Sequence, residues 1–161
     1  MMSIKWDIVA YDRDRHLILA AELKTKLGAS SEWANRFLKN LGNDKGISLP
    51  KYFLLAFPDQ FYLWKEISKP LKQIEPSYHI DARPIFQSYF KRFGIGINKI
   101  GIDVDKISHD SFELLLTSWL REIIDPDKIR DITTDESFKW FVESGLYKDM
   151  IGGSIECEVV V

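Results

Sequence analysis

The 161-residue sequence has a single cysteine, Cys157, and three widely separated histidines. One cysteine excludes an internal disulfide framework, and these residues have none of the spacings of a zinc site. The chain also lacks a glycine-rich dinucleotide or phosphate loop and the G-x-S-x-G nucleophile motif. Cys157 alternates with glutamates and lies on the apolar face of a predicted terminal strand, so we expect a small buried strand residue and not a nucleophile. These absences disfavour zinc-dependent, nucleotide-binding and serine-hydrolase chemistry.

Long hydrophobic runs are also missing, because no run reaches the length of a transmembrane span. The first residues, MMSIKWDIV, lack the charged and apolar regions of a secretory signal. We therefore expect a cytoplasmic protein with no membrane attachment. With 45% hydrophobic and 13% aromatic residues, the chain can bury one sizeable core. We expect one domain, residues 1–161, that folds alone or as a homodimer.

The chain has no large excess of either charge, since its formal net charge is −2. This balance argues against a protein that coats nucleic acid by electrostatics alone. Residues 1–51 contain nine Lys and Arg against six Asp and Glu, whereas residues 52–161 contain thirteen against eighteen. The distribution favours a phosphate-bearing substrate near the N-terminal part and a protein partner for the acidic remainder.

A β-hairpin with unusual charges is predicted near the start of the chain. Residues 4–11 and 17–24 are apolar runs of strand length, and the polar residues 12–15 separate them. A two-residue or a four-residue loop pairs positions that sum to 27 or 29, which places Asp7 opposite Ala20 or Glu22. In both registers Asp7 shares a sheet face with Glu22 and Lys24. Two carboxylates and one ammonium group therefore converge.

Such a group suits metal-assisted hydrolysis of phosphodiesters, because Mg²⁺ binds carboxylates, water and substrate phosphate. An acidic residue on one strand and Glu-x-Lys on the next resembles the PD-(D/E)xK nuclease superfamily, which has the restriction-endonuclease-like fold. The resemblance covers about the first 65 residues, in the order strand, strand, helix, strand. It implies that Asp7, Glu22 and the Leu23 carbonyl bind Mg²⁺, or Mn²⁺ in its place. It also implies that Lys24 is the catalytic lysine.

A helix is predicted over residues 32–41, after a Ser N-cap, with its apolar stripe on one face. In the family this helix lies near the site. Asn35, Arg36 and Lys39 on its other face are therefore candidate phosphate contacts for a nucleic acid, DNA ahead of RNA. An ordinary solvated helix face is the alternative interpretation of these three residues.

The remainder predicts a mixed sheet with a helical C-terminal part. Residues 51–57 and 61–65 form a second hairpin, with a central strand followed by an edge strand. Three helices follow within residues 70–161, capped by Asp81, by Ser108 and by Thr133 with Glu136. A terminal strand over residues 155–161 ends the chain. We thus expect an α/β fold, with the motif-bearing core in residues 1–69.

The helix and first strand that usually open the family's core have no counterpart before Asp7 in this sequence. That helix often supplies another acidic ligand, so we expect a trimmed version, a substitute from a later segment, or an incomplete site. The terminal strand is one candidate substitute, and Glu156 or Glu158 would then approach the metal.

Two functions remain open at this point. The first is a Mg²⁺-dependent nuclease acting on DNA or RNA. The second is a catalytically silent protein of the same fold that acts as a binding or assembly module. A purely structural role is the third interpretation, in which Asp7 pairs with Lys5 or Lys24 and the Glu22 end of the strand is solvated.

Overall fold

A six-stranded mixed sheet forms the centre of the molecule in the computed structural model, which describes residues 5–43, 50–65, 75–92, 104–127 and 136–160. The strand order is β5-β4-β3-β2-β1-β6, with β2 and β3 parallel and the other neighbours antiparallel. The strands are β1 (Lys5–Tyr11), β2 (Leu17–Leu23), β3 (Tyr52–Ala56), β4 (Gln60–Lys65), β5 (Tyr78–Asp81) and β6 (Ser154–Val160). The predicted α/β class with a mixed sheet is therefore confirmed.

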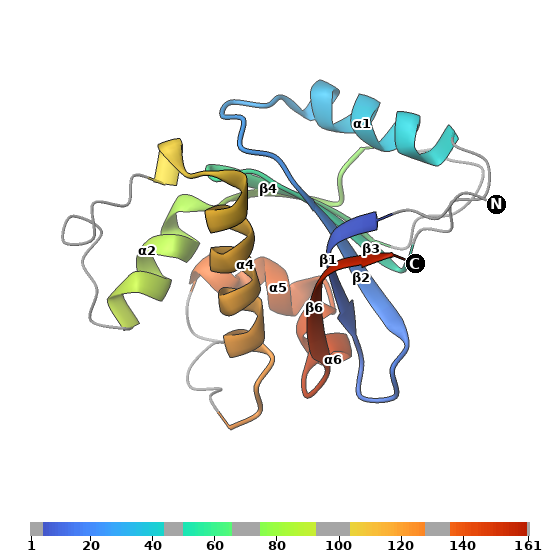
Figure 1. Cartoon of the computed structure of the whole chain (residues 1–161), viewed down its shortest axis with the longest axis vertical. Coiled ribbons are helices and arrows are strands. Elements are labelled where there is room, and N and C mark those ends of the chain that lie inside the picture. Colours follow the sequence, from blue (N-terminus) through green and yellow to red (C-terminus); the bar gives the residue numbers. More distant parts are fainter. Residues whose placement is uncertain (1–4, 44–49, 66–74, 93–103, 128–135, 161) are drawn as a thin grey trace.

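The helices divide unequally between the two faces of the sheet (Figure 1). Helix α1 (Ser31–Asn43) lies alone on one face, where Ala34 and Leu38 are buried. The other face carries α2 (Arg83–Arg92), α4 (His109–Ile123), α5 (Lys139–Glu143) and α6 (Leu146–Met150), with the 3₁₀ turns η1 (Val104–Lys106) and η2 (Glu136–Phe138). Each face has its own apolar core. No helix in the described ranges is long and apolar enough to cross a membrane.

The first hairpin adopts the register of the four-residue loop. Ile8 pairs with Ala21 and Val9 with Ala20, so paired positions sum to 29. A shift follows between Ala10 and Tyr11, next to the turn. The register of the central part of the hairpin brings Asp7 next to Glu22, as one of the two predicted alternatives required.

Strand β1 does not keep a simple alternation of faces throughout. Trp6 and Val9 both belong to the core on the α1 side, whereas Ile8 and Ala10 belong to the core on the other side. Because residues on one face of a strand are two apart, the spacing of three between Trp6 and Val9 means that the alternation is interrupted around Asp7.

Strand β6 lies beside β1 and is antiparallel to it, from the Lys5–Val160 pair to the Tyr11–Ser154 pair (Figure 1). The terminal strand therefore occupies the neighbouring position in the sheet, as one of our alternatives expected. Glu156 does not lie at the Asp7 end of β1, where a substitute metal ligand would be needed. It pairs with Val9 in register, and its carboxylate lies 3.0 Å from Arg15 at the turn end of the hairpin. The side chain of Glu158 lies outside the described part.

Two sequence-based expectations outside the first hairpin are wrong. Strand β4 is not an edge strand, because the four-residue strand β5 pairs with it. Only Ile80 of β5 is buried, so the sequence offered no alternating pattern for this strand. Cys157 is exposed, although its Sγ lies 3.2 Å from Thr117 Oγ1 on α4. The predicted capping residue Thr133 lies outside the described residues.

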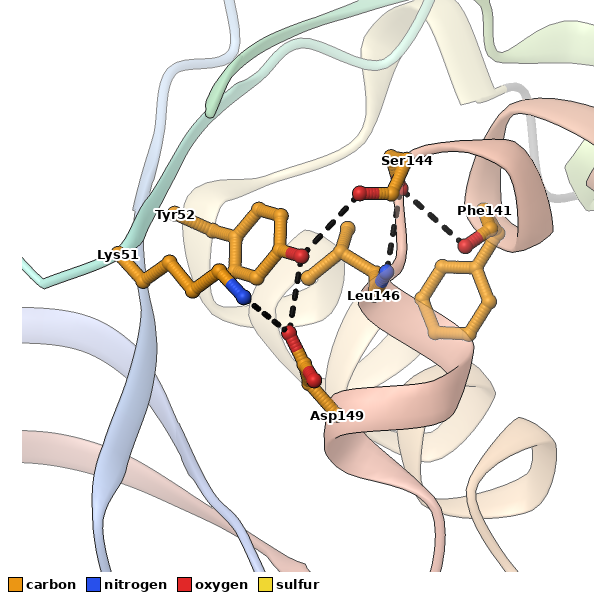
Figure 2. Close-up of polar contacts among 6 residues, drawn as sticks. All are labelled: Lys51, Tyr52, Phe141, Ser144, Leu146 and Asp149. Carbon is orange, nitrogen blue, oxygen red and sulfur yellow. Dashed lines mark hydrogen bonds and ion pairs between the residues drawn. The ribbon is translucent and has the colours of Figure 1, made fainter. Parts of the chain in front are cut away.

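A polar cluster ties β3 to the α5–α6 corner (Figure 2). The buried Tyr52 hydroxyl donates to Asp149 Oδ2 at 2.9 Å and to the Ser144 carbonyl at 3.1 Å. Lys51 Nζ lies 2.9 Å from the same Asp149 oxygen. Gly145 has a φ of 94°, and a Cβ there would lie 2.8 Å from the Tyr52 hydroxyl, so only glycine fits this corner. These bonds fix the helical layer against the sheet.

Candidate functional site

The site is built at the end of the first hairpin, where β1 begins and β2 ends. The Leu23 N–H donates to Asp7 Oδ2 at 2.8 Å, and the Asp7 N–H donates to Glu22 Oε1 at 3.4 Å. Each strand thus offers a side-chain carboxylate to the backbone of the other. The two hydrogen bonds position both acidic groups at the same end of the sheet, as the sequence predicted.

The Glu22 carboxyl group is electrostatically strained. Burial, followed by the negative charge of Asp7, raises the pKa of Glu22 to about 7. A side-chain hydrogen bond with Asp7 also raises it, whereas the Asp7 N–H and the charge of Lys24 act in the opposite direction. Two carboxyl groups in contact cannot both ionise without a nearby cation. The Glu22 carboxyl group, with its pKa raised to about 7, is therefore near the midpoint of its proton equilibrium at neutral pH.

Lys24 follows β2 on the α1 side of the sheet. Its backbone N–H donates to the Ala56 carbonyl at 3.0 Å, and its ammonium lies 5.3 Å from the centre of the Phe37 ring. Glu22 and Lys24 flank Leu23, which belongs to the core of the opposite face. Both side chains therefore face α1, whereas Asp7 reaches the first turn of α4. The sequence predicted all three side chains on one face of the sheet. In the structure Glu22 and Lys24 lie on one face, and Asp7, which reaches toward the other face, meets Glu22 at the end of the sheet.

Helix α4 brings two further side chains that can bind a metal, an imidazole and a carboxylate, close to Asp7. The Ser108 hydroxyl accepts from the Ser111 N–H at 3.2 Å and caps the helix, as predicted. His109 and Glu113 lie one helical turn apart, on the same side. His109 Nε2 lies 3.6 Å from Asp7 Oδ2, and ligand atoms of Asp7, His109 and Glu113 all lie within 4.8 Å of one another.

Sequence reasoning missed His109 and Glu113. We regarded the histidines as scattered, since their partners are distant in the chain. A local signal did exist, namely a histidine and a glutamate four residues apart in the first turns of a firmly predicted helix. That spacing indicates a site only because α4 packs against β1 and brings both side chains close to Asp7.

The donor set of this cluster fits a divalent cation. Carboxylate oxygens are hard ligands, and a neutral imidazole binds first-row divalent ions. The group of close ligand atoms contains Asp7, His109 and Glu113, and Glu22 adjoins it through its contact with Asp7. The carboxylates of Asp7, Glu22 and Glu113 and the ammonium of Lys24 together have a formal charge of −2 when all are ionised. One divalent cation would balance that charge and relieve the contact between Asp7 and Glu22.

The predicted phosphate contacts on α1 have different environments. Arg36 and Lys39 are exposed, whereas Asn35 is half-buried, and its Oδ1 has no hydrogen-bond partner within the described part of the chain. Lys26 Nζ lies 4.7 Å from the Trp33 ring, which adds a second contact between α1 and the segment after β2. Helix α1 thus lies beside Lys24, and a role of its polar face in binding nucleic acid stays a prediction.

A second group of carboxylates and histidine lies at the other end of β1. Asp12, Asp14 and His16 surround the hairpin turn. Asp12 Oδ1 accepts from the Asp14 and His16 N–H groups, each at 2.9 Å, and Asp12 Oδ2 lies 3.1 Å from His16 Nδ1. The hydrogen bonds of the turn thus account for the placement of these residues.

Comparisons with models of protein families, with curated proteins and with solved structures found no match.

Proposed function

We propose that the protein is a divalent-metal-dependent nuclease that hydrolyses phosphodiester bonds of DNA or RNA. The observation that supports this best is the arrival of His109 and Glu113 next to Asp7. A metal site on the hairpin needs a third acidic ligand beside Asp7 and Glu22. Glu113 supplies that ligand from a later segment of the chain, which was one of the sequence-based alternatives.

The order of the elements agrees with the resemblance to the PD-(D/E)xK superfamily. Strands β1 and β2, helix α1 and strand β3 follow in the implied order. Strand β6 flanks β1, and α4 places His109 3.6 Å from the Asp7 carboxylate. We propose that β6 and α4 replace the strand and helix that precede this core in the family.

Each residue has a role in the proposed reaction. Asp7 and Glu113 would hold the cation together with His109, and Glu22 would join them as the ligand that the resemblance implies. The Leu23 N–H fixes the Asp7 carboxylate for that task. The Leu23 carbonyl, a ligand by resemblance, keeps its role as a prediction. The bound cation would supply Lewis-acid stabilisation of charge on the scissile phosphate. Lys24 either orients the attacking water as an ammonium that offsets charge on the phosphate or, in its neutral form, accepts the proton of that water and becomes the ammonium.

The test is cleavage of labelled single-stranded and duplex DNA and RNA by the purified chain, with Mg²⁺ or Mn²⁺ and with EDTA. We expect cleavage that needs the metal ion and that Glu22→Gln abolishes while the melting curve stays cooperative. Glu143→Gln is the matched control, because Glu143 is exposed on α5 and lies 3.9 Å from Lys139. This control variant should cleave like the wild type.

A complete panel left uncut would overturn the proposal. Binding of nucleic acid without cleavage would then favour the catalytically silent binding module. Cleavage that Glu22→Gln leaves unchanged would show that the activity comes from a contaminant or from another part of the chain.

A further inference from the structure

We propose that His109 makes this centre select a first-row transition ion, such as Mn²⁺ or Co²⁺, in preference to Mg²⁺. The inference deepens the proposed function, because it names the cofactor class of the same site. It depends on one feature that the sequence motif does not contain, which is an imidazole nitrogen beside the first acidic residue.

The orientation of His109 supports ligation through Nε2. This nitrogen lies 3.6 Å from Asp7 Oδ2, whereas Nδ1 lies 4.0 Å from Asp110 Oδ1, which is beyond hydrogen-bond distance. Nε2 is therefore the ring nitrogen that faces the acidic group. The His109 side chain is 44% exposed, so an ion can reach it from solvent.

The chemistry of the ligands decides the class of ion. Mg²⁺ prefers oxygen ligands in a strict octahedral shell and keeps several waters. Imidazole suits transition ions, whose affinity for mixed nitrogen and oxygen sites increases from Mn²⁺ to Co²⁺ and beyond. A site of carboxylates alone would not separate these ions in this way. The imidazole nitrogen of His109, beside the carboxylates of Asp7 and Glu113, makes the site distinguish transition ions from Mg²⁺.

One electrostatic effect opposes a cation here. His109 is the first residue of α4, and a helix N-terminus carries about half a positive charge. The three acidic side chains outweigh that partial charge. The helix end therefore weakens binding of every divalent ion to a similar degree and does not alter the preference between them.

The turn cluster around His16 is the internal control for this inference. It has the same residue types, yet both carboxylate oxygens of Asp12 are engaged by groups of its own turn. An ion there would have to displace those hydrogen bonds. We therefore expect the transition ion at His109 and not at His16.

The experiment compares the full-length wild type with His109→Ala and His16→Ala. Calorimetry with Mn²⁺, Co²⁺ and Mg²⁺ should show Mn²⁺ and Co²⁺ binding about tenfold or more tightly than Mg²⁺. His109→Ala should lower the Mn²⁺ and Co²⁺ affinities by about 10–100-fold and leave Mg²⁺ within about threefold. His16→Ala should bind all three ions like the wild type. Both histidines are exposed, and a melting curve for each variant checks its fold.

Pulsed electron paramagnetic resonance of bound Mn²⁺ gives a second readout that does not depend on activity. A coupling to a ¹⁴N nucleus should be present in the wild type and in His16→Ala and lost in His109→Ala. Equal affinities for Mg²⁺ and Mn²⁺, no binding of any ion, or a nitrogen coupling that survives in His109→Ala would each overturn the inference.

These outcomes separate the inference from the proposed function. Selective Mn²⁺ binding through His109 without cleavage of any nucleic acid would refute the nuclease and leave the metal preference standing. Cleavage with Mg²⁺ that is insensitive to His109→Ala, together with equal ion affinities, would do the reverse.

Discussion

The two ends of strand β1 carry the same kinds of side chain in very different settings. At the turn end, Asp12, Asp14 and His16 lie within five residues of one another, and the Asp12 carboxylate accepts from the Asp14 and His16 N–H groups and contacts the His16 ring. At the opposite end, Asp7 meets Glu22 from β2 and His109 and Glu113 from α4. The first cluster is local, whereas three separate segments build the second.

The pKa values show what this difference means. The hydrogen bond from the His16 N–H to Asp12, which is followed by smaller effects, lowers the pKa of Asp12, so the turn favours its charged form. Burial and the charge of Asp7 raise the pKa of Glu22 to about 7, so the site end opposes its charged form. A carboxylate that stabilises its surroundings needs no ligand. One that the fold holds in an unfavourable state is a candidate for function.

The largest expected effect is on cleavage. Glu113→Gln should lower the initial rate of phosphodiester cleavage by about a hundredfold or more, because a lost ligand weakens stabilisation of the transition-state charge. Asp14→Asn, at the other end of β1, should cleave within about twofold of the wild type. Rates at saturating Mn²⁺ measure both variants. Equal losses in the two variants would remove the functional distinction between the clusters.

The second effect is on thermal stability with metal. Mn²⁺ at about 100 times its Kd should stabilise the fold by about 2.7 kcal/mol, which corresponds to about 5–10 °C in Tm. EDTA should reverse the increase. Asp7→Asn should abolish it and Asp12→Asn should retain it, as differential scanning fluorimetry can show. An increase that disappears in Asp12→Asn would place the ion at the turn.

The third effect is the pH dependence of stability without metal. The pKa of Glu22 rises on folding from its ordinary 4.5 to about 7, so stability falls as pH increases between these values and the full cost is present above pH 7. After a discount for its partial exposure, Glu22→Gln in EDTA should be more stable by about 1–3 kcal/mol at pH 8. The difference should vanish near pH 4. Urea unfolding at both pH values measures it, and a destabilised variant at pH 8 would indicate a structural ion pair.

The smallest effect has the opposite sign. The pKa of Asp12 is lowered on folding from its ordinary 3.8, so its carboxylate stabilises the fold above that pH, and the contribution is lost as pH falls through the lowered value. Asp12→Asn should therefore have a slightly lower Tm at pH 7, and the difference should close in strong acid. Melting curves across this range test the sign. An increase in Tm at pH 7 would contradict it.

Local patterns carried most of the successful sequence predictions. The two apolar runs and the polar turn of the first hairpin predicted the meeting of Asp7 and Glu22, because register follows from loop length. The cap at Ser108 and the serine cap before residue 32 were equally local predictions. In the structure the Ser108 hydroxyl accepts from the Ser111 N–H, and Ser30 is the serine that caps α1, accepting from the Trp33 N–H. The continuous apolar run of β3 predicted a central strand correctly.

Long-range packing accounts for what the sequence could not show. His109 and Glu113 gain their meaning only when α4 lies across the start of β1. Strand β5 has too few buried residues to leave a pattern. The interrupted alternation at Asp7 has no signal in the sequence, because it arises where one carboxylate must reach both β2 and α4.

The pairing of β1 with β6 has a consequence for the order of events during synthesis. Strand β1 leaves the ribosome early, but the outer edge of this strand pairs with the last strand in the described chain. Until β6 emerges, that edge is open to pairing with other chains, and non-local pairing of this kind folds slowly. Since α4 also emerges late, the hairpin carboxylates precede His109 and Glu113 by most of the chain. A nascent chain therefore holds an incomplete cluster of side chains, which only the C-terminal half completes.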